Sequence, residues 1–97
     1  MLRITLLCAG GFSTSVMVNK MKNACKENNI QAEIRATSAN NFIEFAAQTD
    51  VLLLAPQISF LENEFKDNYP QLKQMVISGV DYGTMDGKHV IEQVMGL

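Results

Sequence analysis

Apolar residues follow two different spacings along the 97-residue chain, and these alternate from end to end. Residues 2–7 form a short apolar run, which is typical of a strand. A helical repeat follows over about residues 13–28, and its apolar face consists of Met17, Met21, Ala24 and Cys25. Strand-length runs and helical repeats keep alternating, without internal repeats or a flexible linker, which predicts an α/β sheet protein.

The second and third predicted strands differ in polarity. Residues 31–36 alternate strictly between apolar and polar side chains, so one face of this strand is exposed and we expect it at an edge of the sheet. Residues 51–55 are all apolar, which predicts a central strand. Between these strands Ser38 can cap a short helix, whose apolar residues are Phe42, Ile43, Phe45 and Ala46.

The last part of the chain adds one more strand and two helices. Apolar residues at positions 58, 61 and 65 predict a helix, which Pro70 stops shortly afterwards. Residues 74–77 supply a fourth strand, and residues 78–87 are expected to form a polar loop. The final helix begins near Asp86, its expected N-cap. Its predicted buried stripe consists of Val90, Ile91, Val94 and Met95.

Four strands joined by helices predict a parallel open sheet with right-handed crossovers and helices on both faces. With the second strand at an edge and the first and third central, the simplest strand order is 2-1-3-4. This is a flavodoxin-like arrangement, and it resembles the topology of the low-molecular-weight tyrosine phosphatases. The order reverses between strands one and three, so a ligand is expected at their carboxyl ends, where Cys8 and Gln57 emerge.

Composition narrows the class of protein. Apolar residues make up 47% and charged residues 19% of the chain, which fits one globular domain over residues 1–97. A net charge of −2 argues against nucleic acid as a partner. No apolar run approaches the roughly 20 residues of a membrane span. The two cysteines match no zinc spacing, so we expect free thiols in a reducing cytoplasm and no metal. No coiled-coil seam or long unpaired apolar strand is predicted, so we expect a monomer.

Cys8 is the residue most suggestive of chemistry. It ends a strand just before a helix, where backbone N–H groups and the helix dipole favour a thiolate. The segment that follows can turn tightly and offers hydroxyl donors; it consists of Ala9, Gly10, Gly11, Phe12, Ser13, Thr14 and Ser15. A thiolate within such an anion cradle indicates phosphocysteine chemistry. On the loop alone, a buried structural cysteine beside a simple turn is an equally good interpretation.

Better-known phosphate motifs do not fit. A P-loop needs a lysine after its second glycine, and none lies between Arg3 and Lys20. The dinucleotide fingerprint fails because Gly10 and Gly11 are adjacent and no further glycine follows until Gly79, so no nucleotide cofactor is expected. The tyrosine-phosphatase loop has the same spacing, but Thr14 stands where its arginine would be. Because such an arginine accelerates phosphoryl transfer by about 10³ to 10⁵, its absence favours a carrier over a phosphatase.

Five further residues are candidates of lower weight. Gln57 and Tyr82 are expected on loops at the same end of the sheet as Cys8, where they could line the site or serve only as turn residues. Asp81 and Asp86 are interpreted as turn and cap residues, because a carboxylate beside a phosphocysteine would repel it. His89, the only histidine, is interpreted as solvated surface between exposed neighbours.

Over essentially its whole length the sequence resembles the IIB components of the bacterial sugar phosphotransferase system, in the lactose, cellobiose and chitobiose family. The resemblance rests on residues 4–15, on residues 54–57 and on residues 81–87. It implies a phosphotransferase in which Cys8 accepts phosphate from a phosphohistidine of a IIA protein. Cys8 would then donate it to a sugar, a β-linked disaccharide, at the membrane IIC component during uptake. Residues 9–15 would form the phosphate loop.

Two alternatives stay open at the level of the sequence. A small phosphatase would share the reactive Cys8 and the loop but would lack the expected arginine. A non-catalytic regulatory module or thiol sensor would use a reactive Cys8 without taking up phosphate. The sugar is not encoded in the Cys8 loop, because in such a system the membrane component binds it.

Overall fold

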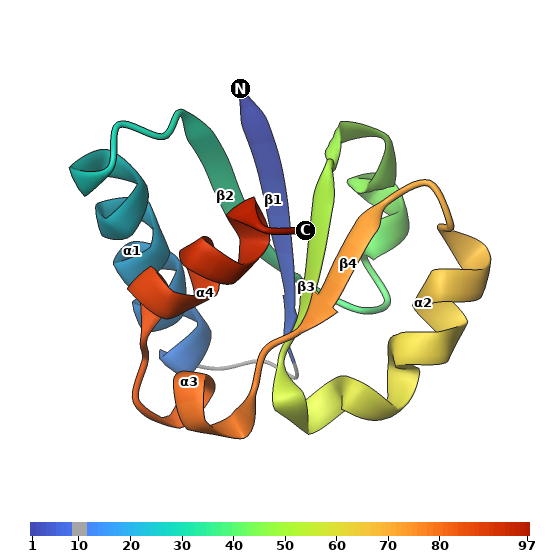
Figure 1. The fold of residues 1–97 in the computed structure, drawn as a ribbon. Helices are drawn as coiled ribbons and strands as arrows, with labels where there is room; N and C mark the ends of the chain where they lie inside the picture. The colour runs from blue at the N-terminus through green and yellow to red at the C-terminus, as the bar shows by residue number, and fades with distance from the viewer. Residues whose placement is uncertain (9–11) are drawn as a thin grey trace.

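The computed structural model describes residues 1–8 and 12–97. Figure 1 shows a central sheet with helices on both sides. In chain order the elements are β1 (Leu2–Cys8), α1 (Phe12–Glu27), β2 (Ala32–Ser38), η1 (Phe42–Glu44), η2 (Ala46–Gln48), β3 (Val51–Leu54), η3 (Pro56–Leu61), α2 (Glu62–Asn68), β4 (Lys73–Val76), α3 (Gly79–Gly83) and α4 (Gly87–Met95).

The four strands are parallel and run in the order β2-β1-β3-β4, which confirms the predicted topology. Polarity explains this order: every residue of β3 is buried, whereas in β2 only Ile34 is buried. The exposed residues of β2 include Ala36, which was predicted on its apolar face. Ile4 of β1 lies between Ile34 and Val51 in the register. All four strands therefore end at one edge of the sheet, which we call the carboxyl edge.

One face of the sheet is covered by α1 and α4, and the other by α2 and the 3₁₀ turns (Figure 1). The predicted apolar stripe of α1 is buried, and Met17 and Met21 are fully inaccessible. α4 approaches α1 so closely that a Cβ on Gly87 would lie 2.5 Å from the carbonyl carbon of Lys20. Only glycine fits this contact, which fixes the start of α4 against α1.

Several predicted helices are shorter or more irregular than expected. The segment after Ser38 forms two 3₁₀ turns instead of one helix, although Ser38 does accept a hydrogen bond from the amide of Asn41. Phe42 is the one large apolar side chain fully buried there, edge-on to the rings of Phe65 and Tyr69, while Ile43 is exposed. One anchor is too little to extend a helix. The helix after β3 likewise begins as 3₁₀ turns with a kink at Ile58.

The prediction of a polar loop over residues 78–87 is wrong in part, because α3 lies within it. Ser78 caps this short helix by accepting a hydrogen bond from the amide of Asp81. The predicted cap of α4 is confirmed: the Asp86 carboxylate accepts from the amide of His89 at 3.0 Å. Met95, predicted to be buried, is exposed at the end of α4. Within residues 1–8 and 12–97, no helix has the length and apolar character that crossing a bilayer requires.

Candidate functional site

Cys8 is the last residue of β1, a central strand, and it pairs with Ser38 of β2. Its side chain is half-buried, and its Sγ lies 3.7 Å from the carbonyl oxygen of Thr37, to which the thiol donates. The sulfur therefore sits at the carboxyl edge, next to the point where the strand order reverses. A parallel sheet binds ligands at this position.

The expected phosphate loop is described only in part. Ala9, Gly10 and Gly11, together with the side chains of Phe12 and Ser13, lie outside the described residues. α1 begins at Phe12, so the first turn of this 16-residue helix follows Cys8 closely in sequence. Thr14 is buried, with 4% of its surface exposed. Ser15 is exposed and lines a groove towards β2 together with Arg35.

Tyr82 brings α3 into contact with the first turn of α1. Its side chain is buried, and its hydroxyl lies 3.3 Å from Oγ1 of Thr14, within hydrogen-bonding distance. The Thr14 hydroxyl thus has a protein partner 68 residues away in sequence. Both residues were candidates from the sequence. Tyr82 was predicted on a loop, however, and its contact with Thr14 was not predicted.

Gln57 and Tyr82 line one cavity of about 440 Å³ at the carboxyl edge. Its other lining residues are Pro56, Gly79, Gly83 and Met85. Gln57 is exposed on η3, directly after β3, as the predicted topology required. Gln57 and Tyr82 therefore border the same hollow, to which α3 also contributes. Exposed apolar side chains of Phe60 and Val80 lie on the same two elements.

Asp81 and His89 form a contact that the sequence did not predict. The Asp81 side chain is buried on α3, and its Oδ2 accepts a hydrogen bond from Nδ1 of His89 at 2.7 Å. His89 is 49% exposed, which confirms its predicted place on the surface. Its hydrogen bond to a buried carboxylate was not predicted. The bond to Asp81, and then its negative charge, raise the pKa of His89 above its ordinary value.

The carboxylate of Asp86 lies close to this pair. One possible metal-ligand atom from each of the three residues lies within 4.8 Å of the other two. Each of these groups already has a protein partner, because Asp86 caps α4 and Asp81 binds His89. Hydrogen bonding within the protein accounts for the cluster. That the chain uses no metal stays a prediction.

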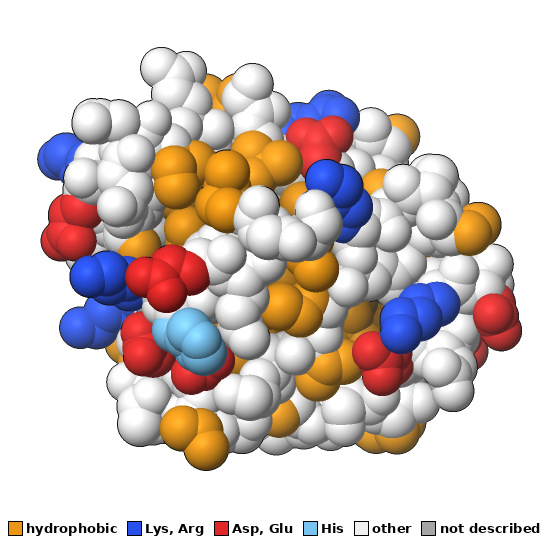
Figure 2. Space-filling view, in the orientation of Figure 1, with side chains coloured by type: hydrophobic (Ala, Val, Ile, Leu, Met, Phe, Trp, Pro, Cys, Tyr) orange, Lys and Arg blue, Asp and Glu red, His pale blue; other side chains and the backbone are white. Residues whose placement is uncertain are grey.

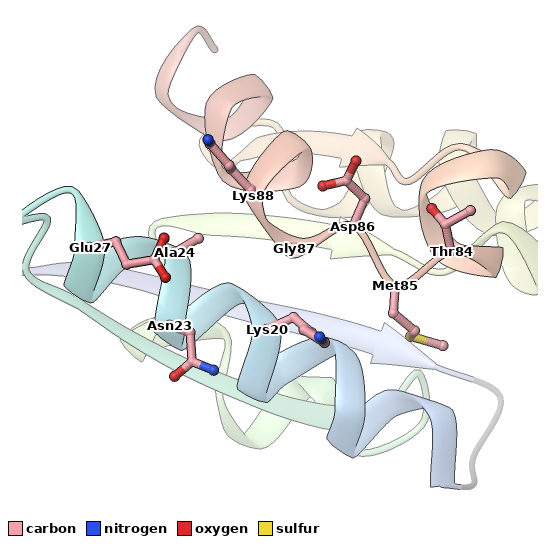
Figure 3. A pocket seen from close by; sticks show the side chains of 9 residues that line it. All are labelled: Lys20, Asn23, Ala24, Glu27, Thr84, Met85, Asp86, Gly87 and Lys88. Carbon is pink, nitrogen blue, oxygen red and sulfur yellow. The ribbon is translucent and has the colours of Figure 1, made fainter.

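A second hollow, of about 390 Å³, lies between α1 and the turn that joins α3 to α4. Figure 3 shows Lys20 and Asn23 on α1, and Asp86 and Lys88 at the start of α4 on the other side of this hollow. Charges of both signs border this groove, so it carries no clear preference for an anion or a cation. The groove lies beside the Asp81–His89 contact.

Comparison with known proteins identifies the family. The family described as "PTS system, Lactose/Cellobiose specific IIB subunit" matches residues 3–93. The chain belongs to this family. As a IIB component it is a phosphotransferase, a phosphoryl carrier in sugar uptake that works with IIA and IIC partners.

Individual relatives agree with this assignment. An oligo-beta-mannoside-specific EIIB component of Bacillus subtilis is 36% identical, covering 100% of this chain and 96% of the relative. A galactose-specific EIIB component of Lactococcus lactis is 40% identical, covering 91% and 88%. A cellobiose-specific EIIB component of Lactococcus lactis is 39% identical with the same coverage.

Solved structures confirm the flavodoxin-like fold. The cellobiose-specific IIB component of Borrelia burgdorferi superposes with a TM-score of 0.80 at 33% identity, covering 98% of this chain and 89% of that chain. The lactose-specific IIB domain of Streptococcus pneumoniae reaches a TM-score of 0.84 at 15% identity, covering 98% and 95%, and supports the fold alone.

Both arginines of this IIB component have carboxylate partners. Arg3, at the opposite end of β1, binds Asp50 through its backbone amide and its guanidinium. Arg35 of β2 pairs with Glu33 and lies over the ring of Phe45. A phosphatase of this loop type would need an arginine on the phosphate. The distribution of charge therefore suits a carrier rather than a hydrolase.

Proposed function

We propose that Cys8 carries the phosphoryl group in this IIB component. The observation that supports the proposal is the position of its thiol, half-buried at the carboxyl edge and at the reversal of strand order. The other cysteine, Cys25, is buried in α1 with 4% of its surface exposed and has no access to a partner protein. Of the two cysteines, Cys8 is the one that combines a nucleophilic atom with a ligand position.

Two displacements at phosphorus complete the proposed cycle. The thiolate of Cys8 attacks the phosphohistidine of the IIA protein, so that the S–P bond forms, the N–P bond breaks and the imidazole takes a proton. A hydroxyl oxygen of the sugar bound by IIC then attacks the same phosphorus. The O–P bond forms, the S–P bond breaks, and the hydroxyl proton passes to a base, so that Cys8 returns as thiolate.

We propose that residues 9–15 surround the phosphoryl group. Backbone N–H groups at the start of α1 have no partners within the helix, and the helix dipole favours an anion there. The contact of Tyr82 with Thr14 supports a role for Tyr82 in orienting this turn. Gln57, on the same cavity as Tyr82, is proposed to line the site where partner and phosphate meet.

The proposed sugar is a β-linked disaccharide. Two of the relatives carry names that specify oligo-beta-mannosides and cellobiose, whereas a third is galactose-specific. We further propose that the protein is a monomer that acts in the cytoplasm and contacts the membrane IIC component transiently. The free thiols of Cys8 and Cys25 support a reducing compartment such as the cytoplasm. Uptake of a panel of disaccharides after gene deletion, with restoration by the intact gene, tests the sugar class.

Reconstituted transfer tests the function. Phosphorylated IIA, this protein, and vesicles that contain the IIC component are mixed with sugar, and sugar phosphate is measured. We expect product with the wild type and with Cys25→Ala, and none with Cys8→Ala. Product formation by Cys8→Ala at the wild-type rate would overturn the proposal. Hydrolysis of an aryl phosphate by the wild type, lost in Cys8→Ala, would favour a phosphatase instead.

A further inference from the structure

α3 carries two consecutive buried side chains that reach different helices. Tyr82 contacts Thr14 in the first turn of α1, and Asp81 contacts His89 in the first turn of α4. Tyr82 and Asp81 are 4% and 5% exposed, respectively. This five-residue helix is too short to be stable by itself, so its position depends on these contacts and on its cap at Ser78. Moving one of the two side chains therefore moves the other.

The contact with His89 stabilises the buried, charged side chain of Asp81. A buried carboxylate is costly unless a hydrogen-bonded partner compensates it. Among the described residues, the hydrogen-bond partner of the Asp81 side chain is Nδ1 of His89 at 2.7 Å. A hydrogen bond between charged groups is about twice as strong as a neutral one. The imidazolium form of His89 therefore holds α3 more firmly than the neutral form does.

Other acidic groups near His89 also favour its protonated form. Asp86, the N-cap of α4, and Glu92, on α4, add to the negative potential at the imidazole and raise its pKa further. Figure 2 shows the pale blue histidine beside red acidic side chains on this face of the molecule. On the adjoining groove α1 contributes Lys20 and Glu27, which are of opposite charge. Lys88 of α4 borders the same groove.

We propose that Asp81 and His89 are positioning residues for phosphoryl transfer, which hold α3 so that Tyr82 keeps the first turn of α1 in place beside Cys8. The proposal rests on the role proposed above for Cys8. Neither residue touches the phosphate in this account; they act through Tyr82 and Thr14. Transfer consequently depends on the protonation of a histidine outside the phosphate site.

The direction of the pH effect follows from the raised pKa of His89. Because the pKa of His89 in the folded protein is raised, the charged contact is present in full below the ordinary value of about 6.5. It weakens as the pH rises through the raised value. The stability of α3, and with it the rate of transfer, is therefore expected to decline at alkaline pH.

Transfer rates across a pH series test the proposal. Transfer from phosphorylated IIA is measured for the wild type, His89→Ala and His89→Asn, since asparagine can keep a donor near the position of Nδ1 but does not titrate. Gln93→Ala, an exposed change on α4, is the matched control. Each rate is divided by the wild-type rate at the same pH, which removes the titration of IIA itself.

At acidic pH we expect His89→Ala to be slower than the wild type by about 3- to 10-fold, with His89→Asn between them and Gln93→Ala unchanged. The deficit should shrink as the pH rises. A ratio for His89→Ala that is the same at every pH would overturn the proposal, even if the variant were less stable. If Cys8 does not carry phosphate, Cys8→Ala takes up as much as the wild type or neither takes up any, and both results are distinguishable from a failure of the His89 proposal.

A second measurement does not need phosphate. In ¹H–¹⁵N spectra, the amide signals of Thr14 and Tyr82 should titrate with the same midpoint as the imidazole of His89. These shifts should disappear in His89→Ala. A Thr14 amide signal that does not shift as His89 titrates would contradict the proposed link from α4 through α3 to α1.

Discussion

The two cysteines of this chain have the same side chain and opposite surroundings. Cys8 ends a central strand, with its sulfur half-buried at the carboxyl edge of the sheet. Cys25 lies on the inner face of α1, and burial raises the pKa of its thiol. The comparison shows that residue type alone does not make a nucleophile. Access to a partner and a place at the carboxyl ends of the strands separate a carrier from a core residue.

Alkylation should separate the two thiols most strongly. Iodoacetamide needs an accessible thiolate, whereas Cys25 is buried and is reached only when the protein opens. We expect Cys8 to react at least about 100-fold faster than Cys25 at neutral pH. Peptide mass spectrometry over time measures both rates in one sample. Equal rates in the folded protein would remove the physical distinction between the two residues.

Removing the contact between Tyr82 and Thr14 should have a smaller effect, and it tests whether this contact orients the helix turn that follows Cys8. Tyr82→Phe removes one hydroxyl and its hydrogen bond, so the rate of transfer from IIA should fall by about 2- to 10-fold. Tyr69→Phe is the matched control, because Tyr69 packs against Phe42 and Phe65 on the other face of the sheet. A rate unaffected by Tyr82→Phe would show that the bond does not orient the first turn of α1.

Cys25→Ala tests the other half of the comparison. The change leaves a small cavity beside α1, and we expect the free energy of unfolding to fall by about 1 kcal/mol. Phosphoryl uptake by the folded protein should be unchanged. Urea denaturation and transfer kinetics measure the two effects separately. A loss of transfer without a loss of stability would assign Cys25 a chemical role that this account denies it.

Asp50 lies at the end of the sheet opposite Cys8 and should give the smallest effect. Hydrogen bonds from the Arg3 guanidinium and amide hold the pKa of Asp50 below its usual range. Their stabilisation is present above the unfolded value of about 3.9 and is lost as the pH falls through the lowered value. Asp50→Asn should therefore flatten the acid limb of stability slightly. It should leave transfer unchanged; slower transfer would contradict the assignment of function to the carboxyl edge.

Most of the fold could be predicted because polarity determines the position of each strand. The strict alternation of residues 31–36 and the apolar run of residues 51–55 assign one strand to an edge and one to the centre. Right-handed crossovers then leave one simple order. Cys8 could be recognised for the same reason, since it follows a predicted central strand.

The missed features depend on tertiary contacts. α3 has only five residues, bounded by glycines, and no local pattern distinguishes it from a loop. Asp81 meets His89 through a turn in which Met85 adopts a φ of 53°, a conformation that its side chain does not predict. The burial of Asp81 and the contact of Tyr82 with Thr14 follow from this packing. Sequence spacing alone could not place His89 beside a buried carboxylate.

Mapping the phosphorylated residue tests the central claim most directly. The protein is incubated with phosphorylated IIA, digested under conditions that preserve phosphocysteine, and analysed by tandem mass spectrometry. The account predicts one phosphoryl group on Cys8, none on Cys25, and no uptake by Cys8→Ala. A phosphoryl group on His89 or Cys25, or undiminished uptake by Cys8→Ala, would contradict it.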